Sequence, residues 1–78
     1  MTLKIISTTE VVYEGQVTMV TLPGTMGSFT VLRNHASLIS TLTPGDIAYR
    51  EADGKEGSFP VKGGIADVDN NVISVCVY

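Results

Sequence analysis

Short runs of β-branched and aromatic residues, each ended by turn-forming residues, follow one another along almost the whole chain. No window keeps apolar residues at the three-and-four spacing of a long helix, and the one candidate, Ala36 to Leu42, is rich in Ser and Thr, which are poor helix formers. Many short strands with frequent turns are typical of a sandwich or barrel, so the chain is predicted to be all-β. The predicted strands are Leu3 to Ser7, Glu10 to Tyr13, Gln16 to Leu22, Ser28 to Leu32, Asp46 to Glu51, Gly57 to Val61, Ile65 to Val68 and Val72 to Tyr78.

Residue pairs that tolerate positive φ predict the hairpin turns. These pairs are Glu14-Gly15, Asp53-Gly54 and Asn70-Asn71, and Asp53-Gly54 is the clearest of them. Gly24 and Gly27 predict two further chain reversals. They do not form a phosphate loop of the Walker type, because no Lys followed by Ser or Thr comes after Gly27.

The last strand, from Asn71 to Tyr78, is apolar on both alternating faces, which predicts cover on either side of it. Cys76 alternates there with Val75 and Val77, so we expect it to be a small buried apolar residue. Gly63-Gly64 predicts a bulge or a close backbone approach where its strand crosses a neighbour.

Size and charge exclude several classes of function. The 78 residues suffice for one domain, 1–78, that hides only about 60% of its unfolded surface, so a partner covering more apolar area would help. Eight acids and five scattered bases give a net charge of −3, which argues against nucleic-acid binding. No apolar stretch approaches the roughly 20 residues of a membrane span. A single cysteine excludes an internal disulfide.

His35 is the only histidine, so each metal or acid-base hypothesis depends on it. No second His or paired Cys completes a ligand set, and Ser37 has neither a nucleophile-elbow motif nor an evident orienting acid. We therefore expect a loop histidine, no metal site, no cofactor and no catalysis.

A carrier domain is the alternative function. Biotinyl and lipoyl carrier domains are also small all-β units, and they present one lysine on a tight hairpin. Lys55, after Asp53-Gly54, and Lys62, before Gly63-Gly64, are the candidates here. Neither has the Met-Lys-Met or Asp-Lys-Ala surroundings typical of those carriers.

A series of short motifs carries a resemblance along essentially the whole chain. With these motifs the chain resembles the amino-terminal β-sandwich domain of the epsilon subunit of bacterial F-type ATP synthases. The motifs are Leu22-Pro23-Gly24, Gly27 with Phe29, His35-Ala36 with Leu38, Pro44-Gly45, and Val61 with Gly63-Gly64.

The resemblance implies a flattened sandwich of about ten strands and a non-catalytic role in the rotor. Such a subunit belongs to the central stalk and couples the gamma subunit to the membrane c ring for proton-driven ATP synthesis. It is a peripheral part of the complex at the cytoplasmic face of the bacterial inner membrane. Longer family members continue into a two-helix hairpin, so the chain is either a short epsilon subunit or a fragment of a longer one.

The resemblance also implies contact residues. The loop Thr25-Met26-Gly27-Ser28 matches the family loop that meets the c ring, although the acid often found at the position of Ser28 is missing. Arg33-Asn34 replaces the more usual Pro-Gly beside the ring; Arg33 could pair with acidic or amide groups there or remain solvated. Ser7, His35 and Ser40 match positions that lie toward gamma.

Overall fold

A computed structural model describes all residues, 1–78, and contains strands but no helix. The prediction of an all-β fold is confirmed, with eight strands where the resemblance implies about ten. The strands are β1 (Thr2–Ile6), β2 (Val11–Gly24), β3 (Gly27–Leu32), β4 (Leu38–Leu42), β5 (Gly45–Glu51), β6 (Glu56–Val61), β7 (Gly64–Asp69) and β8 (Val72–Val77).

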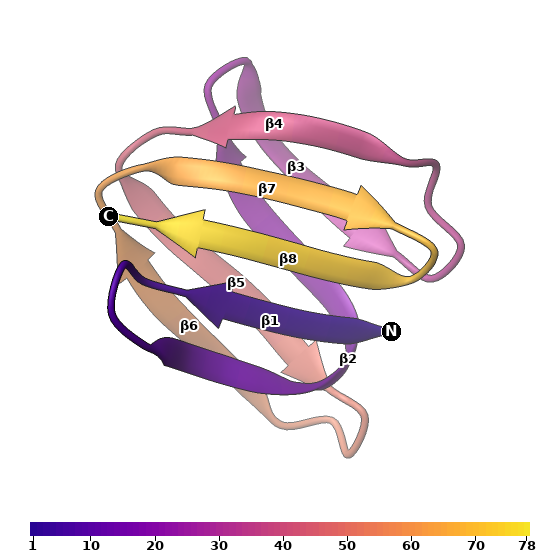
Figure 1. Cartoon of the computed structure of the whole chain (residues 1–78). Helices are drawn as coiled ribbons and strands as arrows, with labels where there is room; N and C mark the ends of the chain where they lie inside the picture. The colour runs from indigo at the N-terminus through magenta and orange to yellow at the C-terminus, as the bar shows by residue number, and fades with distance from the viewer.

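The strands form two layers that share β2 (Figure 1). The front sheet runs from the first half of β2 through β1, β8 and β7 to β4. The back sheet places β3, the second half of β2, β5 and β6 side by side. β1 and β8 pair in parallel, and every other pairing is antiparallel. The molecule measures 28 × 24 × 18 Å, which is the flattened shape expected of a sandwich.

One core fills the space between the layers. It contains Leu3, Ile5, Val20, Leu22 and Ile47, all without exposed surface, and each strand contributes at least one buried residue. The alternation along β7 shows the reason, because Gly64, Ala66 and Val68 point inward while the residues between them are exposed. The period-2 pattern of a strand thus places one face in the core and the other outside.

The predicted turn at Glu14-Gly15 is wrong, because both residues lie within the 14-residue strand β2. The reversal occurs instead after β1, where the Ser7 N–H donates to the Glu10 carbonyl at 2.8 Å and the Ser7 hydroxyl accepts from the Thr9 and Glu10 N–H groups. Two predicted strands therefore merge into one long strand, which crosses from the front layer to the back layer past a register shift between Val17 and Met19.

The other two predicted turns are confirmed. Gly54 has φ 91°, and Asn70 and Asn71 have φ 48° and 62°. The segment Ala36 to Leu42, a poor helix candidate, forms strand β4 from Leu38 onward.

The prediction that the last strand is covered on both faces is wrong. Ile73, Val75 and Val77 are buried, whereas Val72 and Cys76 are exposed. Cys76 is thus not a buried apolar residue. The physical reason is that β8 lies inside the front sheet, with β1 and β7 as neighbours and the core behind it, and no further layer covers its outer face.

Candidate partner-contact surfaces

The loop Thr25 to Ser28 forms the tip of the β2–β3 hairpin and lies beyond β4 at the top of Figure 1. Gly27 has φ 125°, a conformation that favours glycine. The tip is held to the end of β4, because the Thr25 N–H donates to the Thr41 carbonyl at 3.0 Å and the two threonine hydroxyls lie 2.8 Å apart. The side chain of Met26 is 99% exposed.

Arg33 and Asn34 lie at the opposite end of β3 from this tip, so the residues expected to meet the c ring fall at two places. Asn34 has φ 64°, a left-handed conformation that asparagine tolerates better than most residues other than glycine. The Asn34 N–H donates to the Asn71 side-chain oxygen at 2.6 Å, and the Asn71 amide donates back to the Asn34 side-chain oxygen at 3.1 Å. Asn34 is therefore tied to the β7–β8 turn, whereas Arg33 is exposed and forms no salt bridge.

The residues expected to lie toward gamma are also dispersed. Ser7 follows the end of β1 that pairs with Cys76, whereas His35 follows Asn34 near the other end of β8. His35 is partly buried, and its Nδ1–H donates to the Ala36 carbonyl at 2.6 Å. Ser40 lies within β4, where its hydroxyl donates to the Thr41 carbonyl at 3.0 Å.

The outer face of the front sheet extends from Ile6, just before Ser7, to Thr41, whereas Ser40 pairs with the buried Ala66 and lies on the inner side of β4. The strand register aligns Ile6, Cys76, Ile65 and Thr41 in one row across β1, β8, β7 and β4. Ile65 is 51% exposed, and Ile39, one residue before Ser40, is 73% exposed. Ile39 lies on the same face in the neighbouring register row, opposite Asp67. We call Ile6, Ile39, Ile65 and Cys76 together the front apolar row. Sequence reasoning missed these residues, although the period-2 alternation of β4 and β7 places Ile39 and Ile65 outward once it is known which face is covered.

Acidic residues flank the front apolar row. Asp67 pairs with Ile39 across β4 and β7, and together with Asp69 it lines a shallow depression of about 490 Å³ beside Ser37 and Ile39. The Ser37 hydroxyl donates to Asp69 Oδ1 at 2.6 Å, so it does not form a nucleophile–base pair with His35, whose Nδ1 is used by the Ala36 carbonyl.

No cluster of three or more His, Cys, Asp or Glu residues is placed to hold a metal ion. No helical segment has the length and hydrophobicity for a membrane crossing.

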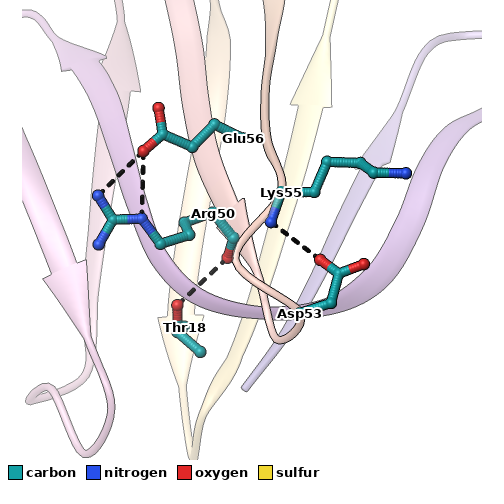
Figure 2. A network of polar contacts seen from close by, with 5 residues as sticks. All are labelled: Thr18, Arg50, Asp53, Lys55 and Glu56. Carbon is teal, nitrogen blue, oxygen red and sulfur yellow. Dashed lines mark hydrogen bonds and ion pairs between the residues drawn. The ribbon is translucent and has the colours of Figure 1, made fainter.

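The lysines considered for a carrier role are surface residues. Figure 2 shows Lys55 at the β5–β6 turn, with its side chain pointing away from Arg50 and Glu56. The turn is fixed by the Lys55 N–H, which donates to Asp53 Oδ1 at 2.9 Å, and by the Arg50–Glu56 salt bridge at 3.0 Å. Lys62 is exposed just after β6.

The comparisons with known proteins identify the family. The sequence model of the family "ATP synthase, Delta/Epsilon chain, beta-sandwich domain" matches residues 1–78. The chain belongs to this family, which confirms the resemblance drawn from the short motifs. Because the match covers the whole chain, the carrier alternative has no support.

Curated relatives agree with the family match. The chain is 41% identical over 73 residues to an ATP synthase epsilon chain of Campylobacter jejuni subsp. doylei, covering 94% of this chain and 57% of the relative. It is 38% identical over 65 residues to an ATP synthase epsilon chain of Brucella anthropi, covering 83% of this chain and 48% of the relative. The chain thus spans about half the length of the curated relatives it matches.

Solved structures share the fold. One chain of the Euglena gracilis mitochondrial ATP synthase complex of OSCP, F1 and c-ring superposes with a TM-score of 0.89 at 23% identity, covering 96% of this chain and 48% of that chain. One chain of the central stalk and c-ring of the Tetrahymena thermophila mitochondrial ATP synthase gives a TM-score of 0.80 at 17% identity, covering 97% of this chain and 61% of that chain.

Proposed function

We propose that this chain is a non-catalytic central-stalk subunit of a bacterial F-type ATP synthase that couples the gamma subunit to the c ring for proton-driven ATP synthesis. The observation that carries the proposal is the family match over the whole chain, together with identities of about 40% to epsilon chains. In this proposal the chain is a peripheral part of the complex at the cytoplasmic face of the inner membrane.

The gamma subunit docks on the outer face of the front sheet. This face begins next to Ser7 and carries the front apolar row, whose burial would add affinity at about 25 cal/mol per Å² of apolar surface. Ser40 borders it from the inner side of the edge strand β4. A broad face of a molecule measuring 28 × 24 × 18 Å can supply roughly the 800 Å² per partner of a standard interface. His35, at the edge of the same sheet, completes the contact.

The c ring contacts the tip Thr25 to Ser28. Arg33 and Asn34 lie at the opposite end of β3, so they join this contact if the ring also reaches that end of the strand. The rigid sandwich suits force transmission, because close-packed interiors have low compressibility. The chain itself performs no chemistry: it holds two partners in a fixed relative orientation.

Co-purification tests the proposal. The chain is co-expressed with gamma and the c subunit of the same organism, and its yield in the complex is measured for the wild type and for Gly27→Glu, His35→Glu and Lys55→Glu. The first two variants should reduce the yield, since a misplaced group in a packed contact costs about 1 to 3 kcal/mol, or roughly tenfold to a hundredfold in affinity. Lys55→Glu changes a solvated hairpin tip and should retain the wild-type yield. A wild-type chain that purifies without gamma and without the ring would contradict the proposal.

A further inference from the structure

The tip of the β2–β3 hairpin presents one large apolar side chain to solvent. Met26 is 99% exposed, more than any other large hydrophobic residue of the chain, and it lies in the turn between β2 and β3. The core does not use this side chain, so its shape and chemistry are free to serve a contact.

The backbone of the tip is fixed in position. Gly24 pairs with Gly27 across the hairpin and with Leu42 of β4, and Thr25 is bonded to Thr41 through both its N–H and its hydroxyl. Beyond Thr41, the Thr43 N–H donates to the Pro23 carbonyl at 2.8 Å. A tip held in this way loses little backbone entropy when it binds, so the contact energy of Met26 is retained as affinity.

The tip and its surroundings carry no charge. Thr25, Met26, Gly27 and Ser28 are uncharged, and so are all residues of β2 after Glu14 and all residues of β3 and β4. The first acid after β4 is Asp46, in β5. The resemblance implies that an acidic residue often stands at the position of Ser28 and could form an ion pair with the ring. The uncharged tip of this chain cannot form that ion pair.

We propose that Met26 anchors the ring contact by entering an uncharged, apolar recess on the ring's exposed loops, with the neighbouring hydroxyls as a polar rim. This inference rests on the proposed function and specifies the chemistry of its ring contact. Met is enriched at protein interfaces, and its flexible thioether adapts to irregular recesses. An apolar anchor makes the affinity nearly independent of salt, whereas an exposed ion pair weakens as salt rises.

The affinity of the chain–gamma complex for the purified, detergent-solubilised c ring tests this inference at about 0.05 M and about 0.5 M KCl. Met26→Ala should weaken binding by about tenfold or more, since it removes most of a buried side chain. Met26→Leu should bind within about threefold of the wild type, because it keeps the apolar volume. Wild-type affinity should change by less than about threefold between the two salt concentrations.

Ser28→Glu distinguishes the two contact chemistries. An uncharged recess should bind this variant more weakly, whereas a cationic ring loop would bind it more tightly and in a salt-dependent manner, which would overturn the inference. Val72→Ala, which truncates an exposed apolar side chain at the start of β8, is the matched control and should bind the ring like the wild type. If the wild type binds the ring and Met26→Ala binds it equally well, the inference about Met26 is overturned while the proposed ring coupling stands. No ring binding by the wild-type complex overturns the inference and the proposed ring coupling together.

Discussion

The hydroxyl of Tyr13 is buried and has no hydrogen-bond partner. Its ring packs against Tyr49 with centroids 4.5 Å apart, and it covers Gly15, where an added Cβ would lie 2.7 Å from the hydroxyl oxygen. Burial, and then the nearby negative charge of Glu51, raises the pKa of Tyr13 above its usual value. Gly15 thus leaves room for the aromatic ring of Tyr13 and does not form a turn.

Tyr13→Phe should leave the free energy of unfolding at neutral pH unchanged or raise it by about 1 kcal/mol, since an unpartnered buried hydroxyl is costly. Because the pKa of Tyr13 is higher in the folded than in the unfolded state, the ionisation of Tyr13 affects the free energy of unfolding only at high pH. Its contribution to stability is fully present below about pH 10, the pKa in the unfolded state, and is lost as the pH rises through the pKa in the folded state. Denaturant titrations should be made at several values between about pH 8 and about pH 11. They should show the wild type losing stability relative to Tyr13→Phe only at the alkaline end of this range. A Phe variant less stable by more than about 1 kcal/mol at neutral pH would indicate that the hydroxyl has a partner.

At the scale of elements, the backbone of β8 leaves no room for a side chain at Gly64 of β7. Gly64 is buried, has φ 154° and pairs with Val77, and an added Cβ would overlap the Cys76 carbonyl oxygen. This is the close backbone approach that Gly63-Gly64 predicts.

Gly64→Ala should lower the free energy of unfolding by about 3 kcal/mol or more, because both clashing groups are backbone and the conformation disfavours a side chain. Gly54→Ala is the control, since Gly54 has φ 91° with nothing within 4 Å of an added Cβ, and it should cost only about 1 to 2 kcal/mol. Denaturant unfolding measures both. Equal costs for the two variants would show that the β7–β8 pair can separate to admit a methyl group.

Sequence reasoning predicted the elements better than it predicted their faces. Strand periodicity and turn pairs such as Asp53-Gly54 are local signals, and they were sufficient for the all-β fold. The turn at Glu14-Gly15 was wrong because both residues lie within the long strand β2, where the ring of Tyr13, two residues earlier, packs over Gly15. Cys76 was predicted to be buried and is exposed, because the alternation of side chains along a strand does not show whether another layer covers an apolar face. The proposed gamma and c-ring contacts of Ser7, His35, Ser40, Arg33 and Asn34 stay predictions, since they depend on partners.

At the scale of the whole molecule, the outer faces of the two sheets differ in the side chains that they expose. The back sheet's central row consists of Thr30, Thr21, Ala48 and Ser58, and the hydroxyls of Thr21 and Thr30 lie 2.9 Å apart. Beside this row Arg50 pairs with Glu56 (Figure 2). The front sheet instead exposes Ile39, Ile65 and Cys76 of its apolar row, with Ile6 half-buried. A domain of this size buries only about 60% of its unfolded surface, so covering the front face would contribute most to stability.

A carboxylate at the centre of each face should therefore separate their roles. Ile65→Glu places a charge within the front apolar row beside Thr41, and Ser58→Glu places the same charge on the exposed back face, so the two variants have equal net charge. Ile65→Glu should reduce co-purification with gamma by about tenfold or more, because the contact would have to desolvate an unpaired charge. Ser58→Glu should leave the yield unchanged, and both variants should unfold cooperatively like the wild type, since neither side chain lies in the core. If Ser58→Glu lost gamma while Ile65→Glu retained it, the docking face would be the back sheet, and the polar row Thr30 to Ser58 would replace the front apolar row as the gamma contact.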